Sequence, residues 1–349
     1  MKKRIAVIFG GQSSEHEVSC MSAANVIDGL NKDKYEIHMI GITKEGHWLY
    51  VEDIAKIRDG SWRESDTTAV ISPDHKKSGI WKMRGDKVEI VPVDVAIPVL
   101  HGKYGEDGTI QGLFELAGIP YAGCGVLSSA VCMDKISTKI FADRIGLRQA
   151  AYVADIARDL SRSEDTILQV EKKLCYPVFV KPSNAGSSKG VSKARDRKEL
   201  KAALELAKKH DHRVLIEETI EGREVECAVL GGQSPEASPV GEILSAAEFY
   251  DFDAKYNNEE SKTVIDPDLP EAVKEKIRTY ALAVFRAVGG FGLARVDFFV
   301  EKETNEVVFN EINTLPGFTN ISMYPMLWEA SGIDREELLD QIINFAYER

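Results

Sequence analysis

Apolar runs alternate with helix-like stripes along the first third of the chain. The runs predict buried strands at residues 4–9, 35–43, 88–91 and 95–100. Between strands, apolar residues recur at helical spacing, as at Val18 and Met21, and predict amphipathic helices. Thr109 is the predicted N-cap of another helix, which ends at Gly118. This rhythm is typical of a parallel sheet with crossover helices, in which ligands bind beyond the carboxyl ends of the strands.

The rest of the chain predicts two further mixed units. The first contains a helical stretch, a strand, a small-residue loop, a helix and a strand, at residues 128–146, 176–181, 183–190, 196–210 and 213–217. The second contains two strands, an aromatic loop, a helix, a strand hairpin and a terminal helix, at residues 224–230, 240–245, 248–256, 270–288, 292–300 with 307–313, and from 334. The pattern therefore predicts three units in succession along the chain.

Length and charge agree with such an organisation. A chain of 349 residues has room for two or three domains at about 150 residues each. The formal net charge of −12 argues against nonspecific nucleic-acid binding, which depends on basic side chains. No apolar run approaches the ~18 residues of a membrane span, and the start of the chain does not resemble a signal peptide. We expect a cytoplasmic protein with neither a nucleic-acid nor a membrane partner.

The five cysteines predict no disulfide framework and no zinc site. Their number is odd, they are scattered, and no CxxC occurs. We expect buried free thiols in a reducing compartment, at Cys20, Cys124, Cys132, Cys175 and Cys227.

The hairpin near the C-terminus carries the most informative polar pattern. Side chains alternate between the faces of a strand, so Arg295 and Asp297 share one face, as do Glu311 and Asn313 on the partner strand. The turn between the strands allows the two pairs to lie side by side. Carboxylate and amide oxygens clustered in this way suit Mg²⁺. The alternative is an ordinary polar face with a surface ion pair, which contributes little stability.

The loop at residues 183–190 follows a buried strand that ends at Lys181. Small residues let backbone N–H groups approach a polyphosphate, and the lysine adds a positive charge. A flexible hairpin loop would have the same composition. No Walker A loop occurs, and neither Gly10-Gly11 nor Gly123-Cys124-Gly125 completes a GxGxxG dinucleotide motif.

Three further features could belong to a site or to ordinary structure. Glu15 and Glu17 flank His16 at the start of a predicted helix, where acidic residues are favoured in any case. His101 follows a buried strand within HGKYGEDG, where a structural and a ligand-facing role are equally compatible with the sequence. The loop at 248–256 has four aromatic residues, which could pack internally or cover a site. No arrangement supports nucleophilic catalysis by a side chain.

Several segments together resemble the D-alanine:D-alanine ligase family, which belongs to the ATP-grasp carboxylate-amine ligases. They occur in the family's order over essentially the whole chain and read GGQSSEHEVS, HGKYGEDGTIQG, MDK, VKPSNAGSSKGV, EFYDFDAKY, and ARVDFF followed by FNEINTLPGFT. The resemblance implies an α/β ATP-grasp fold with three domains. They are an N-terminal Rossmann-like substrate-binding domain at residues 1–125, a central ATP-grasp domain at 126–217 and a C-terminal ATP-grasp domain at 218–349. It also implies a homodimer, with D-alanine and ATP as small-molecule substrates.

The resemblance also implies roles for individual residues. It assigns two Mg²⁺ ions, replaceable by Mn²⁺, to Asp297, Glu311 and Asn313. It assigns ATP to Lys135, Lys181, Ser187, Ser188, Glu217, Glu224, Phe249 and Lys255. It assigns D-alanine to Glu15, His101, Lys255 and Ser322, and the catalytic set to Glu15, Ser187, Tyr256, Arg295 and the N–H of Gly317. Lys189 departs from the expected pattern, and its role stays open.

The implied reaction transfers the γ-phosphoryl group of ATP to one D-alanine, and the amine of a second D-alanine then attacks the acyl phosphate. The product, D-alanyl-D-alanine, serves peptidoglycan precursor synthesis. A D-alanine:D-serine ligase of the vancomycin-resistance type is the alternative, whereas Tyr256 favours an amine over the hydroxyl of D-lactate. A nucleotide sensor without ligase activity would have lost a metal ligand or Arg295, and neither is lost. A dehydrogenase lacks its glycine motif.

Overall fold

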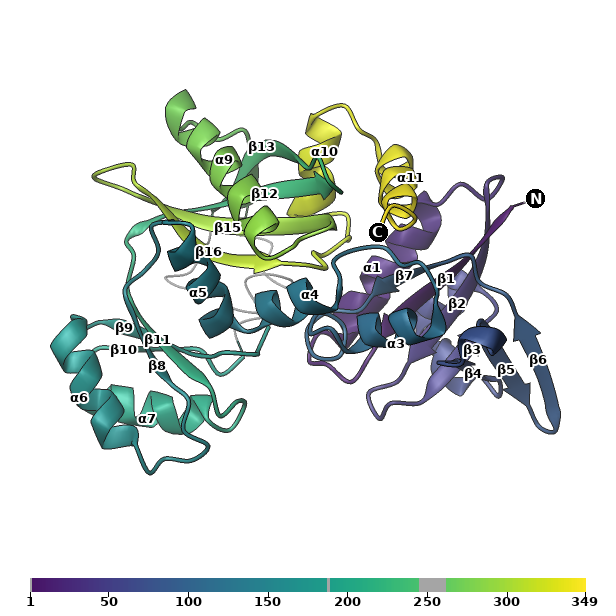
Figure 1. Cartoon of the computed structure of the whole chain (residues 1–349), viewed down its shortest axis with the longest axis horizontal. Helices are drawn as coiled ribbons and strands as arrows, with labels where there is room; N and C mark the ends of the chain where they lie inside the picture. The colour runs from purple at the N-terminus through teal and green to yellow at the C-terminus, as the bar shows by residue number, and fades with distance from the viewer. Residues whose placement is uncertain (1, 187–188, 245–261) are drawn as a thin grey trace.

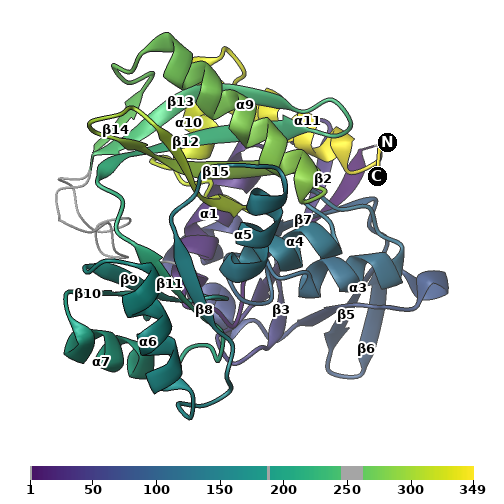
Figure 2. The same cartoon turned by 60° about the vertical axis from the view of Figure 1, so that its left-hand side comes forward.

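The computed structural model describes residues 2–186, 189–244 and 262–349, and its strands form three sheets (Figure 1). The first sheet has seven strands in the order β6-β5-β4-β3-β2-β1-β7, the second has four in the order β10-β9-β11-β8, and the third has five in the order β14-β13-β12-β15-β16. Figure 2 shows helix α5 (Lys135–Arg144) between the third and the second sheets, with α4 (Val126–Met133) beside it.

The first sheet combines a parallel part with an antiparallel extension. Strand β1 pairs in parallel with β2 and β7, as the alternating pattern predicted. Strands β3 to β6 continue the sheet antiparallel, and of these only the stretch at 88–91 was predicted. The elements are β1 (Lys3–Gly10), α1 (His16–Gly29), β2 (Tyr35–Ile42), β3 (Trp48–Val51), α2 (Ile54–Asp59), η1 (Ser61–Glu64), β4 (Thr68–Ile71), η2 (His75–Lys77), β5 (Ile80–Arg84), β6 (Lys87–Val91), β7 (Val95–Val99) and α3 (Thr109–Ala117).

The prediction of Thr109 as a helix N-cap is wrong. Thr109 is the first residue of α3, and the preceding Gly108 has a φ of 89°. The carboxylate of Asp107 accepts the Thr109 N–H at 3.0 Å and the Tyr104 N–H at 2.8 Å. Asp107 therefore satisfies the backbone donor at the start of this helix.

The predicted helix at 128–146 is two helices. Asp134 ends α4 and caps α5, since its Oδ1 accepts the Ser137 N–H at 2.8 Å. Helices α6 and α7 lie on one face of the second sheet (Figure 1). The elements are α4 (Val126–Met133), α5 (Lys135–Arg144), β8 (Tyr152–Asp155), α6 (Ser163–Lys173), β9 (Val178–Pro182), β10 (Ser192–Ala194), α7 (Arg197–Ala207) and β11 (Val214–Glu218).

The third sheet contains the predicted hairpin, β15 and β16, and α9 covers one of its faces (Figure 1). Helix α11 returns to the first unit beside α1, where Tyr35 donates to Asp340 at 2.7 Å. The elements are β12 (Gly222–Gly231), β13 (Glu236–Leu244), β14 (Lys262–Ile265), α9 (Glu271–Ala287), β15 (Gly292–Glu301), β16 (Val307–Asn313), α10 (Met323–Ala330) and α11 (Arg335–Phe345). The three-domain division stays a prediction.

The cysteines are free, as predicted, but burial was wrong for Cys175, which is exposed. The other four thiols are buried. None of the helices in the described ranges is both long and apolar enough to span a membrane.

Candidate active site

A cleft of about 800 Å³ lies where the sheets meet, with lining residues from all three parts of the chain. Of the predicted site residues that the structure describes, all but Asp297 line it: Glu15, His101, Lys135, Lys181, Glu217, Glu224, Arg295, Glu311, Asn313, Gly317 and Ser322. Asp297 is buried, with an exposed fraction of 2%, and accepts hydrogen bonds from two of the lining residues, Arg295 and Asn313. The cleft thus brings together residues more than 300 positions apart in the sequence.

The predicted hairpin register is confirmed. Arg295 pairs across the sheet with Asn313, and Asp297 pairs with Glu311. The guanidinium of Arg295 donates to both carboxylate oxygens of Asp297, at 2.8 and 2.7 Å, and the amide of Asn313 donates to Asp297 at 3.0 Å. The side chains of Arg295, Asp297, Glu311 and Asn313 form one polar cluster within apolar strands, which we call the hairpin cluster.

Sequence reasoning missed Glu226, which extends this cluster onto a third strand. It lies on β12 directly opposite Asp297, so Glu226, Asp297 and Glu311 form a row across β12, β15 and β16. Its carboxylate lies 3.1 Å from Nε of Arg295. Burial opposes the positive charge of Arg295, but Asp297 and Glu226 raise its pKa. The alternation of Glu224 and Glu226 in β12 could have indicated this face.

Asp134 ties the start of α5 to the small-residue loop. It accepts hydrogen bonds from Ser183 Oγ at 2.9 Å and Asn184 Nδ2 at 3.1 Å. The backbone N–H of Lys135 donates to the Ser183 carbonyl at 3.0 Å, and its Nζ donates to the Ala185 carbonyl at 3.1 Å. The same Nζ lies 3.2 Å from Glu311, which links this loop to the hairpin cluster.

The other predicted lysine, Lys181, shares a carboxylate with a lysine that sequence reasoning missed. Its Nζ lies 2.7 Å from one oxygen of Glu217, and Nζ of Lys139 lies 2.6 Å from the other. Burial raises the pKa of Glu217, but the two ammonium groups outweigh burial and bring the value to about 2. Glu217 is therefore a buried carboxylate with two cations.

Glu15 is enclosed between two loops of different units. It is buried, with an exposed fraction of 7%, at the start of α1. A Cβ atom at Gly102 would lie 2.6 Å from its carboxylate, and one at Gly186 would also overlap it. A side chain at either position would displace the Glu15 carboxylate, and Gly102 also has a φ of 69°, which favours glycine. The absence of side chains at both positions lets the loops after β7 and β9 close around one carboxylate.

His101 and Glu106 both connect the loop after β7 to the backbone of Leu315. The imidazole Nδ1 of His101 donates to the Leu315 carbonyl at 3.0 Å, and its Nε2 lies 3.1 Å from Ser22 Oγ. The carboxylate of Glu106 accepts the N–H of Leu315 at 3.1 Å and that of Gly102 at 2.8 Å. Burial and the nearby negative charge of Glu15 raise the pKa of Glu106 to about 8. Sequence reasoning missed Glu106, although it lies within HGKYGEDG.

Gly317, predicted for the oxyanion, and Ser322, predicted for the carboxylate of the second D-alanine, lie in the segment after Leu315. Gly317 packs against Ser322, since a Cβ on Gly317 would lie 2.8 Å from the hydroxyl of Ser322. That hydroxyl accepts the Thr319 N–H at 2.9 Å. Five other predicted site residues lie outside the described residues: Ser187, Ser188, Phe249, Lys255 and Tyr256.

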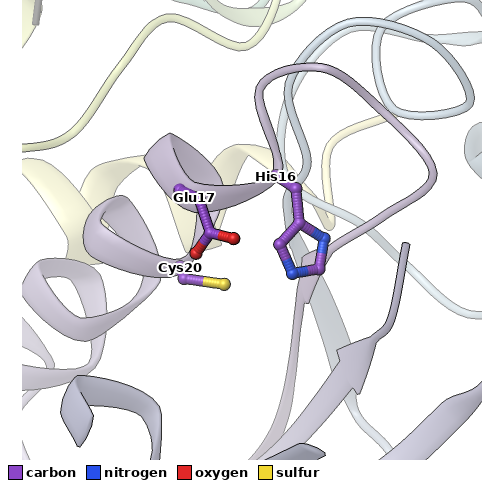
Figure 3. A group of neighbouring side chains, drawn as sticks. All are labelled: His16, Glu17 and Cys20. Atoms are coloured by element: carbon purple, nitrogen blue, oxygen red, sulfur yellow. The ribbon is translucent and has the colours of Figure 1, made fainter. Parts of the chain in front are cut away.

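A second cluster of ligating side chains lies beside Glu15 but does not suit a metal ion (Figure 3). Within the described ranges, His16, Glu17 and Cys20 form the one group of three His, Cys, Asp or Glu residues whose ligand atoms lie within 4.8 Å. The Gly11 carbonyl accepts from Nδ1 of His16, and Arg63 donates to its Nε2, so both ring nitrogens are engaged. Lys44 and Arg63 pair with Glu17, and burial raises the pKa of the Cys20 thiol to about 12.

Comparison with known families identifies the fold. Residues 4–124 match the family model described as D-ala D-ala ligase N-terminus, and residues 141–344 match the D-ala D-ala ligase C-terminus model. The chain belongs to the D-alanine:D-alanine ligase family. The predicted ATP-grasp fold with an additional N-terminal domain is thereby confirmed.

Individual members of this family are similar over their full lengths. The D-alanine–D-alanine ligase of Acetivibrio thermocellus is 54% identical, over 100% of this chain and 96% of the relative. The corresponding protein of Ruminiclostridium cellulolyticum is 53% identical with the same coverage.

Two solved structures have the same fold. The VanG D-Ala:D-Ser ligase from Enterococcus faecalis superimposes with a TM-score of 0.90 at 40% identity, over 99% of this chain and 100% of that chain. The D-alanine-D-alanine ligase from Coxiella burnetii gives a TM-score of 0.85 at 37% identity, over 100% of this chain and 94% of that chain.

Proposed function

We propose that this protein ligates two molecules of D-alanine to D-alanyl-D-alanine at the expense of ATP, releasing ADP and phosphate, for peptidoglycan precursor synthesis. The family and the relatives named above support this activity. The observation that carries the proposal is the joint lining of one cleft by Glu15, Lys181, Arg295 and Ser322. These residues provide an ammonium site, a phosphate site, an oxyanion site and a carboxylate site, in that order.

The hairpin cluster has the donor chemistry that Mg²⁺ requires. Glu311 lies directly across the sheet from Asp297, and Asn313 lies within hydrogen-bond distance of Asp297, so the three side chains offer hard oxygen donors on one face. Two Mg²⁺ ions, or Mn²⁺, held there would neutralise negative charge on the transferring phosphoryl group. Asp297 and Glu311 would have to rearrange their contacts with Arg295 and Lys135 to bind the ions.

The remaining chemistry belongs to side chains of the cleft. Glu15 would hold the ammonium group of the first D-alanine, and Lys135 and Lys181 would position the phosphates of ATP. A carboxylate alone is a poor acylating agent. Transfer of the γ-phosphoryl group of ATP to the carboxylate of the first D-alanine activates it as an acyl phosphate. The second amine attacks the acyl carbon, and Arg295 with the Gly317 N–H would stabilise the oxyanion before phosphate leaves.

Ser322 and His101 are proposed to act at the site of the second D-alanine, whose amine accepts the acyl group. Ser322 would bind the carboxylate of the second D-alanine, and His101 would hold the Leu315–Gly317 backbone close to the substrates through its contact with Leu315. For the adenine and ribose side we propose Glu217 and Glu224. We also propose that Phe249, which lies outside the described residues, contributes to ATP binding. For the closing segments we propose Ser187, Ser188, Lys255 and Tyr256, which lie outside the described residues.

The experiment that tests the proposal measures phosphate release and the product together. Purified protein with ATP, Mg²⁺ and D-alanine should release one phosphate for each dipeptide identified by mass spectrometry. L-Alanine in place of D-alanine is the control and should give neither. Phosphate release that does not depend on D-alanine would contradict the proposal.

D-Serine as the second substrate is the alternative, and the similarity to the VanG D-Ala:D-Ser ligase favours testing it. D-Serine differs from D-alanine by one hydroxyl, which a pocket without a partner for it rejects only weakly. A competition of equal D-alanine and D-serine, read by mass spectrometry, decides between them. We expect the D-alanine dipeptide to predominate, and a predominant mixed dipeptide would establish the alternative.

Three further properties are proposed from the family resemblance. They are a homodimer, a cytoplasmic location and a division into domains at residues 1–125, 126–217 and 218–349. Light scattering coupled to size exclusion tests the dimer, and a monomeric mass at micromolar concentration would contradict it.

A further inference from the structure

Lys139 lies behind the nucleotide side of the cleft and has no assigned role. It projects from α5 one helical turn after Lys135, but Lys135 pairs with Glu311, whereas Lys139 pairs with Glu217. Its side chain has an exposed fraction of 2%, against 18% for Lys181 on the other side of the same carboxylate. Lys181 lines the cleft and Lys139 does not.

The surroundings of Lys139 fix it in place. Its Nζ lies 3.4 Å from Gln149 Oε1 and 3.5 Å from the Ala150 carbonyl, and 5.2 Å from the centre of the Tyr152 ring. The Gln149 amide in turn donates to the Lys139 carbonyl at 2.9 Å. An ammonium held by several buried acceptors stays with its carboxylate, whereas Lys181 has an exposed approach to the cleft.

Charge balance explains why two lysines share one carboxylate. With Glu217 as its sole strong partner, Lys181 would form a neutral pair and offer little attraction to a phosphate. Glu311 and Glu224 also direct negative charge at Lys181. A second buried cation on Glu217 offsets one negative charge, so that the group of Lys139, Lys181 and Glu217 has one positive charge in excess.

We propose that Lys139 is a positioning residue for nucleotide binding, which neutralises Glu217 and thereby leaves Lys181 available to the phosphates. This inference rests on the ATP cleft of the proposed function. It predicts that Lys139 affects affinity for the phosphates of a nucleotide and has little effect on affinity for its nucleoside.

The test compares ADP with adenosine as calorimetric ligands, because both contain adenine and ribose but ADP alone has phosphates. The measured quantity is the ratio of the two affinities. In K139M, which removes the charge but keeps much of the side-chain volume, we expect this ratio to fall about tenfold, the size of one charge-assisted contact. In E217Q, which removes the carboxylate that holds Lys181, we expect a ratio equal to or above that of the wild type.

A matched control is available in the same part of the chain. Lys208 is also a buried lysine, with an exposed side-chain fraction of 6% and an ion pair to Asp155 at 3.2 Å, but it does not line the cleft or contact Glu217. K208M should leave the ratio unchanged while losing comparable stability. A lower ratio in K208M would show that loss of any buried lysine has this effect and would overturn the proposal.

The double variant K139M/E217Q gives the decisive comparison. Removing the carboxylate together with Lys139 should restore the ratio to within about threefold of the wild type. A ratio that stays as low as in K139M, or a K139M ratio equal to the wild type, would overturn the proposal, as would absence of ADP binding by the wild type. These measurements need no ligation, so a protein that fails to make dipeptide but shows these ratios would refute the proposed function and retain the role of Lys139.

Discussion

Two ionic clusters face the same cleft and have opposite excess charge. The hairpin cluster contains three carboxylates, Glu226, Asp297 and Glu311, against the cations of Arg295 and Lys135. The cluster behind the nucleotide side contains two lysines, Lys139 and Lys181, against the single carboxylate of Glu217. Their architecture is similar, since each sets buried strand residues in a small group of ion pairs.

The sign of the excess charge indicates which ligand each cluster completes. A buried group with surplus carboxylates is stabilised by a metal cation, and a group with surplus ammonium is stabilised by a phosphate. Lys135 links the two groups, because it pairs with Glu311 and donates to the loop that carries Ala185. The cleft is therefore electrostatically divided although the whole chain is acidic.

The largest effect is expected for substitution of Arg295 in the hairpin cluster. In R295A the turnover should fall by about 10² to 10³, because a donor to the oxyanion is lost, while ATP binding is retained. R295K is the control that keeps the charge but loses the two-pronged contact with Asp297, and it should recover only part of the rate. Steady-state kinetics with calorimetric ATP binding measures both, and unchanged turnover in R295A would remove Arg295 from this role.

The carboxylates of the same cluster should determine metal affinity. In D297N the Mg²⁺ concentration for half-maximal activity should rise about 10- to 100-fold, the range seen when groups around a metal are altered. The variant E217Q, which alters the group with surplus ammonium, should leave this concentration nearly unchanged. Chelation with EDTA should abolish wild-type activity, and Mg²⁺ should restore it. Equal metal requirements in D297N and wild type would contradict the division of the cleft.

Outside both clusters, Glu15 should affect one substrate. We expect E15Q to raise the KM for the first D-alanine about tenfold or more, since a charged contact to the ammonium group becomes neutral. Affinity for ATP should stay intact. Initial rates over a range of D-alanine concentrations measure this effect, and a wild-type KM would argue against the ammonium assignment.

The last expected effect is a pH dependence of stability, not of turnover, and it concerns Glu106. Burial and then Glu15 raise its folded pKa to about 8, against about 4.3 in an unfolded chain. A carboxyl with a raised pKa stabilises the fold below its unfolded pKa, and this contribution is lost as pH rises toward the folded value. The stability advantage of wild type over E106Q should therefore shrink from about pH 5 to about pH 8, by at most about 1.4 kcal/mol per pH unit. Urea unfolding at several pH values measures it, and a constant difference would contradict the assignment.

Local patterns predicted much of the fold. The hairpin of β15 and β16 follows from alternation and a turn, and the caps Asp196 and Asp334 begin α7 and α11 as polar residues before apolar stripes. The strands β3 to β5 were missed because they are short and belong to an antiparallel extension that alternation with helices does not indicate. The helix break at Asp134 was missed because its partners, Ser183 and Arg213, are remote in sequence.

The site residues likewise divide into those that the sequence could pair and those that it could not. Asp297 and Glu311 could be paired from the sequence because one turn joins their strands. Glu226, Glu106 and Lys139 could not, because Glu226 faces a strand about 70 residues later, Glu106 bonds to Leu315, and Lys139 on helix α5 meets Glu217 on strand β11. In each case the decisive partner is remote in sequence, and only the tertiary structure brings it close.

The division of the cleft is tested most directly by a crystal structure with ADP and Mn²⁺, whose anomalous scattering locates the metal. This division of the cleft predicts Mn²⁺ within bonding distance of oxygens of Asp297, Glu311 and Asn313. It also predicts a phosphate oxygen within hydrogen-bond distance of Nζ of Lys181, with Lys139 still paired to Glu217. Mn²⁺ bound away from the hairpin, or phosphates that make no contact with Lys181, would contradict it.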